Sequence, residues 1–333
     1  MKICIVGAGA IGGMIAVRLA RIGHEVTAIV RGANLEAVRR QGGMKLIGED
    51  GTETFGALAA TDNPAEAGPQ DHVILALKAH QLTPLLGSLP ALFAAHTSVI
   101  TMQNGIPFWY FHRHGGEYEG RTVESVDPGG ALIRAIGAER IIGAIVYPAS
   151  ELVESGVIRH IEGNRFTLGE PDGIDSPRVR EIASAMRDAG FKAPVTADIR
   201  GEIWLKLWGN VVFNPVSALT HATLEDICRY PLTRELAGRV MAEAQAIGEK
   251  LGVRFKVSIE KRIAGAESVG AHKTSMLQDV EAGRAMELEA LVGAVIEMGR
   301  ITGLPTPHID AVYACAKLLD QTLQARKGRL TLG

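Results

Sequence analysis

The 333-residue chain is poor in cysteine and in aromatic residues, and both shortages narrow the class of protein. Its three cysteines, Cys4, Cys228 and Cys315, lie far apart and form neither a CxxC pair nor a zinc-binding spacing. This excludes a disulfide-stapled secreted domain, and we expect a reduced, cytoplasmic location with Cys4 as a buried apolar residue. Aromatic residues make up 5% of a composition that is 47% hydrophobic, which suits a chain rich in helix and buried strand.

An excess of charge of one sign is also missing. There are 35 lysines and arginines against 37 aspartates and glutamates, for a formal net charge of −2. This balance gives no basic footprint for nucleic acid and no polybasic patch for a membrane surface. No run of about eighteen apolar residues occurs, so no transmembrane helix is predicted. We expect a small-molecule partner, with no nucleic acid and no membrane; a homodimer stays open.

Spacings typical of metal sites are absent as well. His112 and His114 stand two residues apart, but no third ligand follows at a credible spacing. We therefore predict no metal.

What the sequence does contain is a glycine-rich turn between an apolar run and an amphipathic segment. Gly7, Gly9 and Gly12 form GxGxxG ahead of the segment Met14–Ile22. Gly7 allows the tight turn, Gly9 lets a pyrophosphate approach the backbone, and Gly12 lets helix and strand pack closely. A second apolar run at 25–30 completes a β-α-β unit. The pattern predicts a dinucleotide site.

This stretch has two other interpretations. The first is a merely structural glycine turn, since GxGxxG alone is common. The second is a secretory signal peptide. A secretory apolar region has no reason to carry GxGxxG or to continue into a charged amphipathic helix that ends at Arg21.

The residue after the second apolar run indicates which dinucleotide is bound. NAD sites place an acid there for the ribose 2′-hydroxyl, whereas NADP sites place a cation for the 2′-phosphate. Here the residue is Arg31, and the next carboxylate, Glu36, lies inside the following predicted helix. We predict NADP(H); a solvated surface arginine is the alternative.

Further along, strands and helices alternate, which predicts a parallel, doubly wound sheet. The expected strands are 44–47, 54–58, 71–77, 98–102 and 141–147, with helices at 35–41, 81–94 and 176–189 and a hairpin formed by 157–162 and 165–168. Lys78 follows a buried strand at the edge where ligand crevices form, although a solvated lysine is an equal reading. Gln103-Asn104-Gly105 follows the next strand.

Residues 106–139 interrupt this alternation of strands and helices. Phe108-Trp109-Tyr110-Phe111 precedes a long polar, glycine-containing stretch, and a loop of that length is usually functional or flexible. Because the stretch follows a strand end, we predict that Phe108–His114 borders the substrate cleft.

From about residue 198 the pattern is almost wholly helical, with helices expected at 200–214, 232–251, 257–268, 275–301 and 306–325. We therefore predict a Rossmann-type domain over 1–195, with 106–139 as an insertion, and an all-helical substrate and catalytic domain over 196–333.

One predicted helix carries an unusual polar stripe. Lys206, Asn210 and Asn214 fall at i, i+4 and i+8 and share a face, and Pro215 should end or kink the helix. Asparagine is a mediocre helix former, so two on one stripe amid apolar residues point to ligand binding. A solvated polar face is the alternative.

A second polar cluster surrounds Ser275. Ser275-x-x-Gln278 matches a capping box, which would make Ser275 a helix N-cap. The functional reading is a hydroxyl and helix N-terminus presented to a substrate carboxylate. The spacing does not separate the two.

These motifs together resemble the ketopantoate reductases (2-dehydropantoate 2-reductases) over nearly the whole chain. The resemblance rests on GAGAIGG, Arg31, Leu77-Lys78-Ala79, Gln103-Asn104-Gly105, Trp204-x-Lys206 with Asn210 and Asn214-Pro215, and Ser275–Asp279 with Glu287. It implies a helical domain like the C-terminal domain of 6-phosphogluconate dehydrogenase. It also implies NADPH-dependent reduction of a 2-oxo acid, foremost 2-dehydropantoate to pantoate in pantothenate biosynthesis.

The resemblance also implies roles for single residues. Lys206 would donate the proton, with Glu287 beside it as the second catalytic residue. Substrate would be held by Asn104, Lys206, Asn210, Asn214 and Ser275. NADP(H) would be held by Gly7, Ala8, Gly9, Ala10, Ile11, Gly12, Arg31, Lys78, Asn104, Ala149 and Glu287. The chain departs from the family in 106–139, which looks like an insertion.

Two alternatives to this function stay open. One is a paralogous reductase of another 2-oxo acid or of an imine. The other is a catalytically silent NADP(H)-sensing protein, against which the presence of Lys206 and both asparagines argues.

Overall fold

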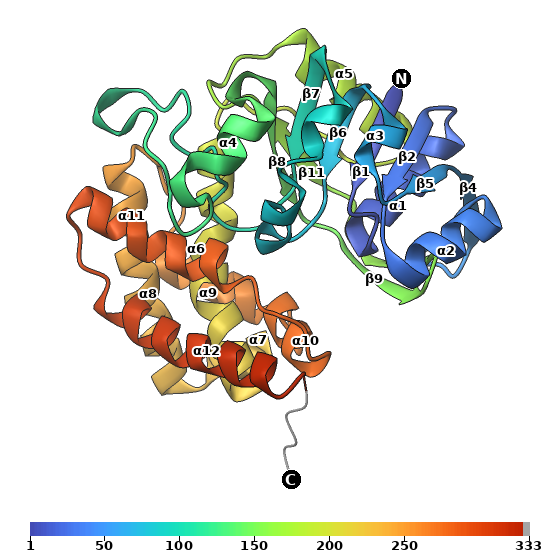
Figure 1. The fold of residues 1–333 in the computed structure, drawn as a ribbon. Helices are drawn as coiled ribbons and strands as arrows, with labels where there is room; N and C mark the ends of the chain where they lie inside the picture. The colour runs from blue at the N-terminus through green and yellow to red at the C-terminus, as the bar shows by residue number, and fades with distance from the viewer. Residues whose placement is uncertain (329–333) are drawn as a thin grey trace. The chain divides into compact units, whose positions relative to one another are not determined.

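The computed structural model of the chain describes residues 1–328 (Figure 1). The chain divides into two compact units. The first holds residues 1–103, 107–122 and 129–199, and the second holds 104–106, 123–128 and the chain from Arg200 onward. In the part described, no helix has the length and apolar character needed to cross a bilayer.

The first unit is a mixed α/β structure. Its strands are β1 (Lys2–Val6), β2 (Glu25–Ile29), β3 (Gly43–Ile47), β4 (Glu53–Ala57), β5 (Ala59–Thr61), β6 (Gln70–Leu75), β7 (Phe93–Thr101), β8 (Ile141–Val146), β9 (Ala149–Glu154), β10 (Val157–Glu162) and β11 (Phe166–Gly169). Its α-helices are α1 (Ala10–Arg21), α2 (Gly32–Gln41), α3 (Pro64–Ala67), α4 (Ala131–Ile136) and α5 (Pro177–Asp188).

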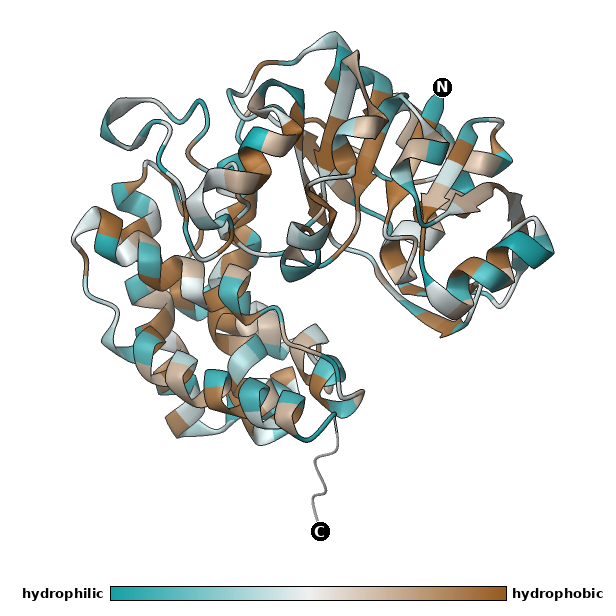
Figure 2. Ribbon diagram, viewed as in Figure 1, coloured by the Kyte–Doolittle hydropathy of each residue, from teal (hydrophilic) through white to brown (hydrophobic). Residues whose placement is uncertain are grey.

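A seven-stranded sheet forms the centre of this unit. Its order is β11-β8-β7-β6-β1-β2-β5, with every neighbouring pair parallel except β11 with β8. The order reverses between β1 and β6, which is the switch point of a Rossmann-type sheet, and ligands of such sheets bind at the carboxyl ends of the strands there. The buried strands are mainly apolar, as the brown in Figure 2 shows, because both faces of a parallel sheet are covered.

One helix expected in this sheet does not form. Residues 81–94 contain the 3₁₀ turns Thr83–Leu85 and Leu89–Leu92, and β7 already begins at Phe93. Pro84 and Pro90 explain the difference, since proline inside a helix removes a hydrogen bond and clashes with the preceding turn. The prediction of a helix over 81–94 was wrong.

A second, four-stranded sheet was not foreseen. Its order is β4-β3-β10-β9, and it packs against α1, which also contacts β1 and β2 of the large sheet. Strand β10 pairs with β9 and β3, while β11 joins the large sheet, so the predicted hairpin of 157–162 with 165–168 was wrong. A Cβ atom on Gly13 would lie 2.7 Å from the Ile158 side chain, so glycine allows α1 this close.

The stretch 106–139 is ordered into turns and the helix α4. The side chains of Phe108, Trp109, Tyr110 and Phe111 are buried, and Trp109 donates a hydrogen bond to the Thr101 hydroxyl at 2.7 Å. These aromatic side chains therefore form core of the first unit, which differs from the expected lining of a cleft.

The second unit is helical. Its helices are α6 (Ile199–Thr220, whose first residue is counted with the first unit), α7 (Leu224–Arg229), α8 (Pro231–Lys250), α9 (Ile259–Glu267), α10 (Ser275–Glu281), the π-helix η7 (Glu289–Gly293), α11 (Ala294–Thr302) and α12 (Pro307–Ala325). Helix α6 runs on through Pro215 to Thr220, so the predicted end near 214 was wrong. The expected single helix at 275–301 is broken after α10, where Gly283 has a positive φ of 65°, and η7 then continues directly into α11.

Candidate active site

Lys206, Asn104 and Glu287 meet within the second unit. The ammonium of Lys206 donates a hydrogen bond to Oδ1 of Asn104 at 2.6 Å, and Nδ2 of Asn104 donates to Oε2 of Glu287 at 3.4 Å. The Asn104 carboxamide thus lies between a cation and an anion, with its oxygen toward the first and its nitrogen toward the second. In the sequence, Asn104 is 102 positions from Lys206 and 183 positions from Glu287.

The backbone after Asn104 is fixed on the π-helix η7. The amide of Ile106 donates a 2.9 Å hydrogen bond to the carbonyl of Ala290, one turn after Glu287. Gly105, with φ 84°, passes so close that a Cβ atom there would lie 2.1 Å from the same carbonyl. A π-turn is rare in helices and frequent at functional sites. Here it brings Asn104 and Glu287 together.

Burial changes the pKa of the Lys206 ammonium. Desolvation lowers its pKa from 10.5 to about 8, while the charge of Glu287 acts in the opposite direction. A buried cation loses hydration, which favours the neutral form. A pKa near 8 leaves Lys206 largely protonated at neutral pH yet able to release a proton, which is the property of a general acid.

The polar stripe of α6 is not a solvated face. Asn210 is half-buried, and Asn214 is 5% exposed. Neither carboxamide has a hydrogen-bond partner among residues 1–328, and buried amides are normally paired. The opposite face of α6 is core, with Trp204 and Trp208 fully buried. Asn210 and Asn214 therefore have amide groups to offer a ligand.

Ser275 is not the N-cap of α10. The N-cap of α10 is Thr274, whose hydroxyl accepts from the Leu277 amide at 3.2 Å, so the capping box at Ser275 was wrong. Ser275 is exposed in the first turn, and within residues 1–328 no hydrogen bond joins it to Lys206, Asn104 or Glu287. The structure therefore does not bring it into the lysine cluster.

The glycine turn of the first unit forms a pocket of about 150 Å³ at the carboxyl ends of β1 and β2. Gly7 has a positive φ of 94°, and a Cβ atom on Gly12 would lie 2.3 Å from the carbonyl of Gly7. At Gly9 a Cβ atom would meet nothing within 4 Å, so this space is open to a ligand. Gly9 is also the N-cap of α1, where free amides favour an anion. The cradle fits a dinucleotide pyrophosphate.

Arg31 lines this pocket. Lys78 follows Leu77, which lines the pocket, but Lys78 is not itself among the lining residues. Ala149 is the first residue of β9 in the small sheet and also lies outside the lining. The lining residues are Val6, Gly7, Ala8, Gly9, Ile29, Val30, Arg31, Asn34, Asp62, Leu77 and Leu85.

Sequence reasoning missed Asn34. Its Nδ2 donates to the Ala8 carbonyl at 3.1 Å, and its Oδ1 accepts from the Gly156 amide at 2.8 Å. Asn34 therefore ties the glycine turn to the small sheet. Its place three residues after Arg31, at the start of the next helix, was the available signal.

The chain matches a known protein family over most of its length. The family described as "Ketopantoate reductase PanE/ApbA" matches residues 3–173, and "Ketopantoate reductase PanE/ApbA C terminal" matches residues 198–320. A 2-dehydropantoate 2-reductase of Mesorhizobium japonicum is 55% identical over 320 residues, covering 96% of this chain and 98% of the relative. One from Pyrococcus horikoshii is 30% identical, covering 95% and 97%.

Solved structures agree with this result. A protein of Ralstonia solanacearum MolK2 assigned to the ketopantoate reductases superposes with a TM-score of 0.92 at 41% identity, covering 96% of this chain and 98% of its own. A 2-dehydropantoate 2-reductase from Methylococcus capsulatus gives 0.83 at 27% identity, covering both chains completely. A Rossmann-type unit followed by a helical unit, with these matches, defines a dinucleotide-dependent oxidoreductase. The chain belongs to the ketopantoate reductase family.

Proposed function

We propose that the chain reduces 2-dehydropantoate to pantoate with NADPH, as a step of pantothenate biosynthesis. The observation that carries the proposal is the ammonium of Lys206, which is held 2.6 Å from Oδ1 of Asn104. Reduction of a ketone builds negative charge on its oxygen, and a fixed ammonium stabilises that charge and supplies the proton. The 55% identical relative is named for the same reaction.

NADPH, when bound, supplies the hydride that reaches the carbonyl carbon. Lys206 transfers a proton from Nζ to the carbonyl oxygen, so that the ketone becomes a hydroxyl group. Asn104 holds the lysine amine in place through its Oδ1 atom, and Glu287 holds Asn104. We assign Asn210, Asn214 and Ser275 to the 2-oxo acid, whose carboxylate and hydroxyl need amide and hydroxyl partners.

For the cofactor, we propose the glycine turn 7–12 for the pyrophosphate and Arg31 for the 2′-phosphate of NADP(H). Guanidinium pairs with phosphate by charge-assisted, often bidentate hydrogen bonds. We assign Lys78, Asn104, Ala149 and Glu287 further contacts to the same dinucleotide.

The domain boundary near 195 is kept as part of the proposal, with 1–195 binding the cofactor and 196–333 the substrate. The two compact units divide between Ile199 and Arg200, which supports this organisation. The insertion 106–139 contributes segments to both units. The cytoplasmic location, which is inferred from the three free cysteines, stays a prediction. A homodimer also stays a prediction.

The experiment that tests the function follows NADPH absorbance at a fixed enzyme concentration against a panel of 2-oxo acids. The panel contains 2-dehydropantoate, the same acid without its 4-hydroxyl group, and unbranched analogues. The highest kcat/KM for 2-dehydropantoate is expected. A clear preference for another acid or for an imine would make the chain a paralogous reductase, and no turnover with bound NADPH would make it a sensing protein.

A further inference from the structure

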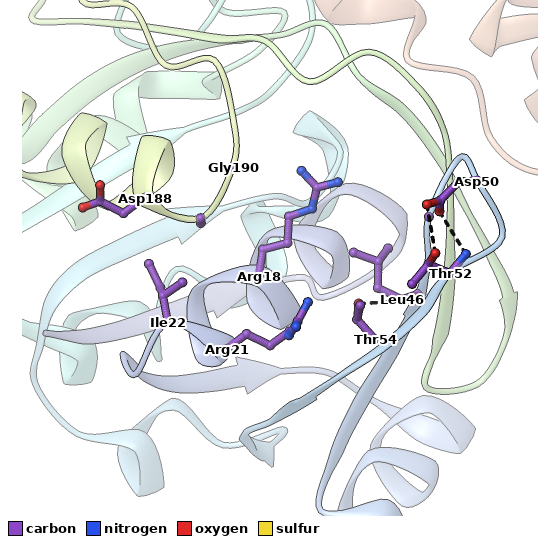
Figure 3. A pocket seen from close by; sticks show the side chains of 11 residues that line it. Arg18, Arg21, Ile22, Leu46, Asp50, Thr52, Thr54, Asp188 and Gly190 are labelled. Atoms are coloured by element: carbon purple, nitrogen blue, oxygen red, sulfur yellow. Dashed lines mark hydrogen bonds between the residues drawn. The ribbon is translucent and has the colours of Figure 1, made fainter.

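A second pocket of the first unit, with a volume of about 440 Å³, shares no residue with the dinucleotide pocket (Figure 3). It is formed by the last turn of α1, the turn between β3 and β4, and the end of α5. The charged residues that line it are Arg18, Arg21, Asp50 and Asp188.

Arg18 is held in place by an aromatic ring and an imidazole, and within residues 1–328 it makes no ion pair with a carboxylate. Its guanidinium lies 4.6 Å from the centroid of the Phe191 ring, and its Nη2 lies 3.3 Å from Nδ1 of His160. On the other side of that imidazole, Nε2 of His160 is hydrogen-bonded to the Gly163 carbonyl and lies 3.3 Å from Glu49. Burial lowers the pKa of Arg18, and the charge of Glu49 only partly offsets this. A half-buried guanidinium fixed in this way favours a nearby anion.

Arg21 lies one turn further along the same helix. It is exposed, and within residues 1–328 it has no ion-pair or hydrogen-bond partner. In Figure 3 both side chains start from α1; the Arg21 side chain extends toward Thr54, and the Arg18 side chain extends up the view, with its guanidinium above Leu46. The pocket therefore contains two guanidinium groups.

The two acids do not neutralise this pair. The Asp50 carboxylate is engaged by its own turn, since it accepts hydrogen bonds at 2.9 Å from both the amide and the hydroxyl of Thr52. The Asp188 carboxylate points away from both arginines in Figure 3. Within residues 1–328, no ion pair joins either carboxylate to Arg18 or Arg21, and Ile22 and Leu46 add apolar lining.

We propose that this pocket binds a small organic anion, with one phosphate or carboxylate group between Arg18 and Arg21 and a short apolar stem against Ile22 and Leu46. The proposal does not depend on the reductase activity. It assigns a second ligand site to the Rossmann-type unit, at the opposite end of α1 from the glycine turn.

Isothermal titration of the full chain with two probes tests this: inorganic phosphate, and isovalerate as a carboxylate with a branched apolar stem. All titrations are repeated in an Arg31→Gln background, because Arg31 in the dinucleotide pocket is the other candidate phosphate contact. Saturable binding of at least one probe at one site is expected in both backgrounds. The probe that binds more tightly identifies the anionic group.

Arg21→Gln should weaken this binding about tenfold or more, since a charge-assisted hydrogen bond to the anion is lost. Arg18→Lys should also weaken it, because lysine keeps the charge but loses the planar fork. Arg21 is exposed, so its variant folds whether or not Arg18→Lys is impaired. Arg40→Gln, an exposed arginine on α2, is the matched control and should bind like the parent.

Three results would overturn the proposal. They are the absence of saturable binding for both probes, unchanged affinity in Arg21→Gln, and equal weakening in Arg40→Gln, which would mean non-specific attraction to positive charge.

Discussion

Gly105 and Ala290 are in direct backbone contact: a Cβ atom added to Gly105 would lie 2.1 Å from the Ala290 carbonyl oxygen. The same carbonyl accepts the hydrogen bond from the Ile106 amide. Because Asn104 precedes this contact and Glu287 stands one turn before Ala290, the contact fixes the spacing between the two side chains. A glycine at 105 is therefore required for the lysine cluster.

We predict that Gly105→Ala lowers kcat by roughly a hundredfold, since a misplacement of about 1 Å can have that effect. The added Cβ must push the backbone away from Ala290, and alanine is also strained at a φ of 84°. Steady-state kinetics and a thermal melt would be measured together. Gly238→Ala on α8, where an added Cβ meets nothing within 4 Å, should keep normal kinetics. A normal kcat in Gly105→Ala would show that this contact does not position Asn104.

A second prediction concerns the anchoring of 123–128 to α11. The Glu297 carboxylate accepts hydrogen bonds from the amide of Glu124 at 2.6 Å, the amide of Ser125 at 2.8 Å and the hydroxyl of Ser125 at 2.5 Å. Glu297→Ala should lower the free energy of unfolding by roughly 1–3 kcal/mol, because three charge-assisted hydrogen bonds to the carboxylate are lost.

Chemical denaturation measures that loss, and limited proteolysis should show new cleavage near 123–128. Glu36→Ala, at an exposed position on α2, serves as the control and should change the stability by no more than about 0.5 kcal/mol. If Glu297→Ala were as stable and as protease-resistant as the control, the carboxylate would not anchor the segment.

Cofactor preference is tested at Arg31. We expect the parent enzyme to prefer NADPH over NADH, and Arg31→Ala to raise the KM for NADPH far more than the KM for NADH, because only NADPH offers a 2′-phosphate. Arg40→Ala controls for the loss of a positive charge from α2. Equal use of both dinucleotides by the parent enzyme would contradict the role given to Arg31.

The sequence predicted those parts of the fold that are encoded locally. The glycine turn 7–12 and the alternation of strands and helices can be read within a few residues, because backbone freedom and side-chain periodicity act over that range. The polar stripe of α6 was equally visible, since Lys206, Asn210 and Asn214 repeat at helical spacing.

What the sequence did not predict depends on contacts between distant residues. Strand β10 pairs with β3 across more than a hundred positions, and no local pattern at 157–162 distinguishes that partner from β11. The contact of Asn104 with Glu287 spans 183 positions. At 274–275 two adjacent hydroxyl residues could each cap a helix, and the choice of Thr274 depends on packing around Leu277.

The central prediction concerns Lys206 as the general acid. Its pKa of about 8 is set by burial, and the acid acts only in its protonated form. Deprotonation of Lys206 should therefore lower kcat/KM as the pH rises through about 8. At pH 6–7 kcat/KM should be near its maximum. Lys206→Ala should lower kcat by about 10²–10⁴-fold, the usual contribution of a positioned acid, with NADPH still bound.

Comparison of Lys206→Arg with Lys206→Ala is the most direct measurement, made as kcat and KM for 2-dehydropantoate at saturating NADPH. Arginine keeps the positive charge but does not release a proton readily. If Lys206 is the proton donor, both variants lose kcat to a similar extent and arginine gives no rescue. Near-normal kcat with a raised KM, restored by arginine, would contradict this account and reduce Lys206 to a residue that holds the substrate.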